Sequence, residues 1–183
     1  MTKVKVELVD VYCQDTEDVT GADDFYLVGG LVGGAITKGI LTTPIKINDK
    51  QKKFFKPGQT VLFEGEIPQG QSIKGGLKAY DEDAAKDWAK YGQTVQEITN
   101  AISGALAVVS PPEAVAETIL SVATKGVGIL NSINKDDLLG ATELEISFTE
   151  PSHEERAWKM SKKQDSRSWS SWDYTLNYRI IRS

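Results

Sequence analysis

Two clusters of acidic residues, far apart in the chain, have the side-chain types and spacing that could do chemistry. The first runs from Asp15 to Asp24 and the second from Asp81 to Asp83, and each follows a run with the alternation of a β-strand. Carboxylates held about 4 Å apart repel by roughly 4 kcal/mol per pair at an effective dielectric of about 20. A hard cation with oxygen ligands is the simplest group that could offset this repulsion.

The composition excludes several other classes of function. The chain has 183 residues, 40% of them hydrophobic and 26% charged, which is ordinary for a globular domain with a real core. Its net charge of -5 leaves no basic excess to neutralise phosphates, so we expect no nucleic-acid partner. Cys13 is the only cysteine, which excludes an internal disulfide and disfavours a thiolate metal site.

The sequence also carries expectations about location. The first residues show no signal peptide, and no run of about 18 apolar residues predicts a transmembrane helix. A cytoplasmic protein is therefore expected, with leaderless secretion left open.

Alternation of apolar and polar residues predicts eight β-strands. The last is the clearest, with Trp172, Tyr174 and Leu176 facing one side. The glycine pair Gly29-Gly30 in the second strand predicts a bulge or a weak point. The eight strands are expected at residues 3–12, 25–32, 38–47, 61–67, 72–80, 142–148, 157–162 and 172–180.

Between residues 84 and 133 the period changes to that of amphipathic helices. Apolar residues recur with 3-4 spacing from Trp88 to Val109, and Ser110 to Glu113 has capping-box spacing for a second helix that ends near Ile133. Two helices with almost no linker must fold back as a hairpin. We therefore predict one domain over residues 1–183, with a helical hairpin inserted at 84–133. We expect its apolar stripes to pack on each other or on the sheets, with membrane contact as the alternative.

The acidic residues and the strands together resemble a C2 domain, a β-sandwich family that binds calcium between loops at one end. Asp18 and Asp24 are six residues apart, and Asp24 leads straight into a strand, as in the first calcium loop of the family. Asp81 and Asp83 match the Asp-x-Asp of its third loop, and Asp137 before Leu-Leu-Gly matches the aspartate at the end of that loop. The sequence departs from the family where the helical hairpin separates these two parts, and where a phenylalanine replaces the proline after Asp24.

The resemblance implies a fold and a set of ligands. The fold is an eight-stranded antiparallel C2-like sandwich of phospholipase-C-like topology, because one strand precedes the first loop and three follow the third. Backbone carbonyls near Glu17 and Glu82 would complete the coordination of Ca²⁺. The implied ligands are Asp18, Asp24, Asp81, Asp83 and Asp137, with Asp15, Asp23, Asp87 and Asp136 in reserve. The alternative is that Asp83 caps the first helix and that the other aspartates lie in solvated turns.

On this resemblance the leading function is calcium-dependent docking to a membrane or a partner protein. The alternative is a calcium-stabilised assembly module that uses the hairpin for protein contact. No nucleophile lies at a meaningful spacing from His153, the only histidine, so we expect no enzyme. A lysine-rich turn around Phe54 and Phe55 is interpreted as a solvated strand edge, with anionic lipid as the alternative ligand; its lysines are Lys46, Lys50, Lys52, Lys53 and Lys56.

Overall fold

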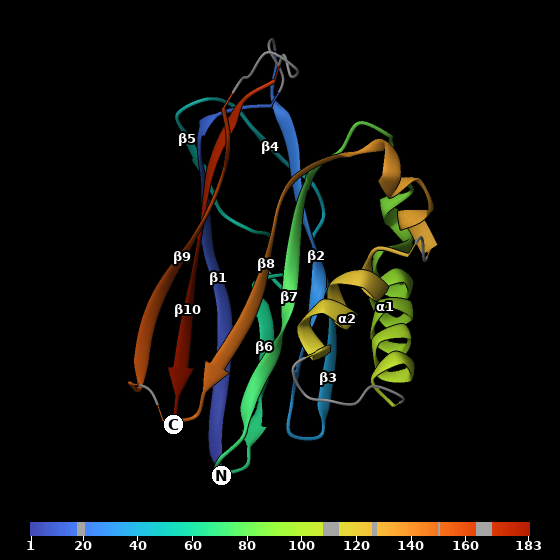
Figure 1. Ribbon diagram of the computed structural model, residues 1–183. Helices are drawn as coiled ribbons and strands as arrows, with labels where there is room; N and C mark the ends of the chain where they lie inside the picture. The colour runs from blue at the N-terminus through green and yellow to red at the C-terminus, as the bar shows by residue number, and fades with distance from the viewer. Residues whose placement is uncertain (18–20, 108–113, 126–127, 150, 164–169) are drawn as a thin grey trace.

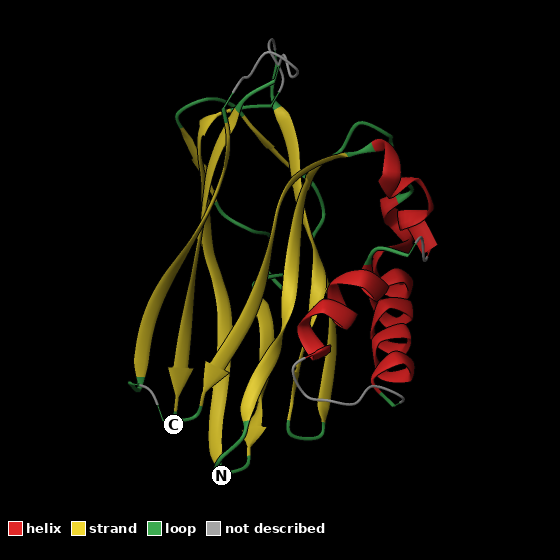
Figure 2. Ribbon diagram, in the orientation of Figure 1, coloured by secondary structure: helices red, strands yellow, loops and turns green. Residues whose placement is uncertain are grey.

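Strands with one apolar face are stable only when that face is covered, and this chain covers it by stacking two antiparallel sheets (Figures 1 and 2). The core between the sheets holds Val6, Phe25, Leu77 and Leu176, all fully buried. The computed structural model describes residues 1–17, 21–107, 114–125, 128–149, 151–163 and 170–183.

The first sheet is built around β1. β10 pairs along one side of β1, with β9 beyond it at the edge. β6 and β5 share the other side of β1, β6 along its first half and β5 near its end. The strands of this sheet are β1 (Thr2–Asp15), β5 (Gln51–Lys53), β6 (Val61–Ile67), β9 (His153–Lys162) and β10 (Trp172–Arg182).

The second sheet is built around β2 in the same way. β7 pairs along one side of β2, with β8 at the edge, while β3 and β4 share the other side. The strands of this sheet are β2 (Asp23–Gly33), β3 (Ile36–Leu41), β4 (Ile45–Ile47), β7 (Ser72–Asp81) and β8 (Asp137–Ser147).

The predicted number of eight strands is wrong, because the described residues form ten. The expected strand 38–47 is interrupted: Thr42 Oγ1 accepts a hydrogen bond from Leu27 N–H at 2.9 Å, and Pro44 has no N–H to donate. β5 follows the turn at Lys50, whose φ is 56°. β3 and β4 lie along the same side of β2, and β5 and β6 lie along the same side of β1. The ten strands therefore occupy eight positions in the two sheets.

The helical segment between β7 and β8 covers the outer face of the second sheet (Figure 2). Ile98, Ile102 and Ile119 are buried there against Tyr26 and other residues of the sheet, and they form a second core. The apolar stripes therefore pack on the sandwich. The helices are η1 (Trp88–Lys90), α1 (Tyr91–Leu106), α2 (Val115–Ala123) and η3 (Gly128–Lys135). No helix in the described ranges is long and apolar enough to cross a membrane. The predicted capping box, Ser110 to Glu113, lies outside the described residues.

A row of three glycines lets the helices approach this sheet. Gly39, Gly30 and Gly76 are register partners across β3, β2 and β7. A Cβ atom at Gly39 would lie 2.7 Å from the backbone nitrogen of Thr99 in α1, and one at Gly76 would lie 2.6 Å from the side chain of Leu120 in α2. The glycines therefore mark a close approach, not the weak point predicted from the sequence.

Cys13 is buried in the core between the sheets, and burial raises the pKa of its thiol to about 12. Because the thiolate is the reactive form, we expect a thiol reagent at about pH 8 to leave the folded chain unmodified and to modify it once urea unfolds it. Mass spectrometry of the two samples measures the difference. Equal labelling rates before and after unfolding would contradict the buried position.

Candidate functional site

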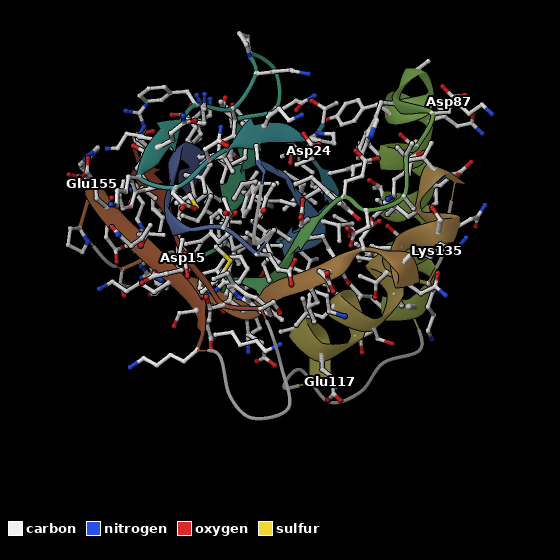
Figure 3. All side chains as sticks on the ribbon, turned by 90° about the horizontal axis from the view of Figure 1, so that it is seen from above. Asp15, Asp24, Asp87, Glu117, Lys135 and Glu155 are labelled. Atoms are coloured by element: carbon white, nitrogen blue, oxygen red, sulfur yellow. The ribbon has the colours of Figure 1, made fainter. Side chains whose placement is uncertain are left out.

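The four predicted carboxylate ligands that the structure describes lie at the end of the second sheet where β2 begins, β7 ends and β8 begins, opposite the chain termini (Figure 1); they are Asp24, Asp81, Asp83 and Asp137. We call this end of the sheet the loop end. Extended strands present alternate side chains to opposite faces, so the facing of each carboxylate follows from its register. Figure 3 looks down on this end and shows Asp24 well apart from Asp15, with Asp87 out on the helical side.

Asp81 is the most enclosed of these four described ligands, with 3% of its surface exposed. Its register partner on β2 is Phe25, whose ring lies in the core between the sheets, so Asp81 faces between the sheets as well. Asp81 Oδ1 accepts a hydrogen bond from the backbone N–H of Asp24 at 2.6 Å. This bond joins the first acidic segment to the second.

Asp137 is the register partner of Asp81 on the other side, in β8. The pairing follows a register irregularity between Ala79 and Tyr80, and cross-strand partners have Cβ atoms about 5 Å apart, so the backbone register places Asp81 and Asp137 side by side; we call them the carboxylate pair. Asp83, two residues beyond Asp81, is exposed, as is Asp137. The structure thus brings Asp137 next to the cluster Asp81 to Asp83, although the helical insertion separates them in sequence.

The remaining predicted ligands differ in their surroundings. Asp24 is half-buried, and its register partner on β4 is Lys46, an opposite charge. Asp18 lies outside the described residues. Within the described ranges, no three or more His, Cys, Asp or Glu side chains form a group that could hold a metal ion.

All four reserve carboxylates have other partners. Asp15 accepts a hydrogen bond from Ser171 Oγ at 2.7 Å, and Asp87 caps η1 by accepting from the N–H of Ala89. The helix cap suggested for Asp83 is therefore supplied by Asp87. Asp23 and Asp136 are both buried, each in a hydrogen-bond network of its own.

Asp23 connects the two sheets beneath the first acidic loop. Its carboxylate is fully buried, and Oδ2 accepts hydrogen bonds from Tyr174 Oη at 2.5 Å and from Glu17 N–H at 2.7 Å. Burial, with the hydrogen bond to Asp23 next, raises the pKa of the Tyr174 phenol above its ordinary value, so the phenol keeps its proton to donate. The network fixes the backbone where this loop leaves β1.

Asp136 and Glu82 turn toward the helices, where they meet Lys86. Lys86 Nζ forms an ion pair with Asp136 Oδ2 and lies 3.9 Å from Glu82 Oε1. Glu82 also accepts a hydrogen bond from Trp88 Nε1 at 2.9 Å, and burial raises the pKa of its carboxyl group. Sequence reasoning missed Lys86, although the Glu82–Lys86 spacing of four residues was a visible signal.

The lysine-rich turn is partly tied to the first sheet. Lys52 Nζ lies 3.4 Å from Asp10 Oδ2, which is nearly buried. Phe54 is 69% exposed, whereas Phe55 is buried in the core between the sheets. An exposed aromatic ring thus lies beside lysines on this surface.

No family model matches the sequence, and no curated protein matches it significantly. Among solved structures, the chain is similar to one described as the structure of a C2 domain, at 14% identity over 100% of this chain and 99% of that one, with a TM-score of 0.43. It is similar to human GIVD cytosolic phospholipase A2 at 11% identity over 99% of this chain and 17% of that one, with a TM-score of 0.41. A C2 domain of plant extended synaptotagmin 1 is matched at 13% identity over 99% of this chain and 93% of that domain, with a TM-score of 0.38.

The order of the strands tests the predicted topology directly. One strand, β1, precedes the loop of the first acidic cluster, and three strands, β8, β9 and β10, follow the second cluster, Asp81 to Asp83. The helices lie between β7 and β8, where the sequence placed the insertion. In fold, the chain is therefore an antiparallel C2-like β-sandwich of the phospholipase-C-like topology, with inserted helices.

Proposed function

We propose that the chain is a non-catalytic calcium-binding module whose loop end docks on a membrane or a partner protein when Ca²⁺ is bound. The observation that carries the proposal is the carboxylate pair. Asp81 and Asp137 lie directly opposite each other on neighbouring strands, and like charges in that position cost stability. A cation bound between the two carboxylates would remove this repulsion, so the pair is a candidate binding site.

The donor chemistry favours calcium. Every proposed ligand offers oxygen, and a set drawn from loops and strand ends suits the larger, more flexible coordination of Ca²⁺ better than the octahedron of Mg²⁺. Asp81 and Asp137 would hold the ion from the second sheet. Asp83 and Asp18 are proposed to complete the site, whereas Asp24 alternates to the face of β2 opposite Phe25, beside Lys46. The bound ion would supply two positive charges to the carboxylate pair.

Calorimetry of the metal-free chain with Ca²⁺ tests this proposal. We expect Asp83→Asn/Asp137→Asn to weaken calcium binding by at least ~10-fold, because both exposed carboxylates are ligands. The matched control is Glu143→Gln/Glu155→Gln, which removes two exposed negative charges far from the loop end and should bind as the wild type does. Negligible heat with the wild-type chain, or equal weakening in both double variants, would refute the proposed site.

Sedimentation with vesicles then identifies what the loaded module docks on. Pelleting with anionic vesicles in Ca²⁺ but not in chelator would support docking on lipid. A calcium-dependent oligomer without pelleting would instead support the assembly function, with the helical segment as a protein contact.

A further inference from the structure

The helical insertion begins and ends at one buried ion pair. Lys86 follows the last residue of β7 by five positions, and Asp136 immediately precedes β8. The two residues are 50 positions apart in sequence, yet Lys86 Nζ contacts Asp136 Oδ2. Their side chains are 1% and 0% exposed. The pair therefore joins the two points where the chain leaves and re-enters the sheet.

Further bonds tie this pair to the turn after β7 and to β2. Asp136 accepts hydrogen bonds from Tyr26 Oη at 2.5 Å and from the N–H of Ala84 at 3.2 Å. Lys86 Nζ donates to the carbonyl of Ala84 at 3.0 Å and lies 5.4 Å from the centroid of the Tyr26 ring. Three segments of the chain thus meet at one charged pair.

A pair of this kind is difficult to open. Both charges lie away from water, so separating them leaves a buried charge without its partner, which is far more costly than breaking a surface pair. The neighbouring pair Lys90–Asp87 is a direct contrast, since its side chains are 63% and 58% exposed at a distance of 3.4 Å.

We propose that Lys86 and Asp136 are positioning residues that form a latch across the insertion. The latch holds the first residues of β8 against the end of β7, and so keeps Asp81 opposite Asp137 before any cation arrives. In this arrangement Asp136 pairs with Lys86 and does not bind the metal, whereas its neighbour Asp137 faces the proposed calcium site. The calcium part of this inference rests on the proposed function, whereas the latch itself does not.

Amide hydrogen exchange of the metal-free chain tests the latch alone. We expect Lys86→Met to speed exchange at Asp81 and Asp137, register partners where β7 meets β8, by roughly 100-fold, because the buried carboxylate loses its partner. Exchange at Val6 and Leu176 in the first sheet should stay as in the wild type. Lys90→Met makes the same chemical change in the exposed pair and should leave all four amides unaffected. Equal exchange at the β7–β8 end in Lys86→Met and wild type would overturn the latch.

Calcium titration then tests the positioning role. If the latch aligns the carboxylate pair, Lys86→Met should bind Ca²⁺ at least ~10-fold more weakly than Lys90→Met. Unchanged or tighter binding in Lys86→Met would overturn the positioning role, since it would mean that removing the ammonium group simply freed Asp136 or lowered repulsion. If the wild-type chain binds no calcium, the proposed function fails while the exchange experiment still decides the latch.

A second variant covers the case in which Lys86→Met does not fold. Lys86→Met/Asp136→Asn leaves no unpaired charge, and the asparagine oxygen can still accept from Ala84 N–H. This variant should fold and should still show faster exchange at Asp81 and Asp137 than Lys90→Met. Wild-type exchange in the double variant would overturn the latch.

Discussion

Replacing Gly39 with alanine is expected to push α1 off the second sheet and to lower the free energy of unfolding by about 2 kcal/mol. The added Cβ would lie 2.7 Å from the backbone nitrogen of Thr99 and 2.8 Å from its Oγ1. Backbone atoms of a helix cannot turn aside as a side-chain tip can, so the helix itself must move. The hydrogen bond from Gly39 N–H to Thr99 Oγ1, now 2.9 Å, would also be strained or lost.

Gly104 provides the matched control for this prediction. It lies in α1 with nothing within 4 Å of an added Cβ, so Gly104→Ala should stabilise the chain by about 0.5–1 kcal/mol through helix propensity. Urea unfolding measures both variants, and hydrogen exchange in α1 shows whether the helix has moved. The close-approach explanation fails if the two alanines shift the unfolding midpoint in the same direction.

Tyr174→Phe is expected to destabilise the chain by about 2 kcal/mol, although it removes a single oxygen atom. The ring would keep its stacking on Phe25, whose centroid lies 5.4 Å away. The loss comes from Asp23, a fully buried carboxylate that would no longer receive the phenol's hydrogen bond. Because this bond joins β10 to the start of β2, its removal weakens the contact between the two sheets under the first acidic loop.

The same substitution at Tyr12 separates this effect from the general cost of losing a hydroxyl. Tyr12 Oη donates to Gln14 at the surface, so Tyr12→Phe should change the free energy of unfolding by no more than about 0.5 kcal/mol. Chemical denaturation of the two variants under identical conditions is the measurement. Similar stability losses in both would show that the Asp23–Tyr174 bond contributes nothing beyond an ordinary hydroxyl contact.

Much of the sandwich could be predicted because alternation reports burial on one face. The last strand, β10, was expected at residues 172–180 and runs from Trp172 to Arg182. The division of β3 from β4 could not be read in this way. It depends on Thr42 bonding through its side chain to Leu27 in another strand, and alternation carries no information about such a contact.

The helical side shows a different limit of sequence reasoning. The apolar stripe of α1 was visible from its period, but the part of the sheet on which it packs was not. The row Gly39, Gly30 and Gly76 comes from three strands and becomes a row only when their registers are set. From the sequence alone, the pair Gly29-Gly30 was therefore interpreted as a bulge or a weak point of one strand.

The candidate site divides in a similar way. The resemblance to C2 domains singled out Asp81, Asp83 and Asp137 as candidate ligands, and the structure places Asp81 opposite Asp137. The roles of Asp23 and Asp136 depended on Tyr174 and Lys86, which are distant in sequence and approach only in the folded chain. Carboxylates of equal appearance in the sequence thus have separate roles, because burial and partners differ between neighbours.

The pairing of Asp81 with Asp137 also bears on how the chain folds. This contact closes a long loop, residues 82 to 136, and the chain entropy lost on closure is roughly 2 kcal/mol greater than for a four-residue turn. An amphipathic helix that forms within the loop and docks on the second sheet recovers part of that loss by burying apolar surface. β8 is therefore expected to join β7 late in folding, after α1 has reached its row of glycines, so that the carboxylate pair is among the last features to assemble.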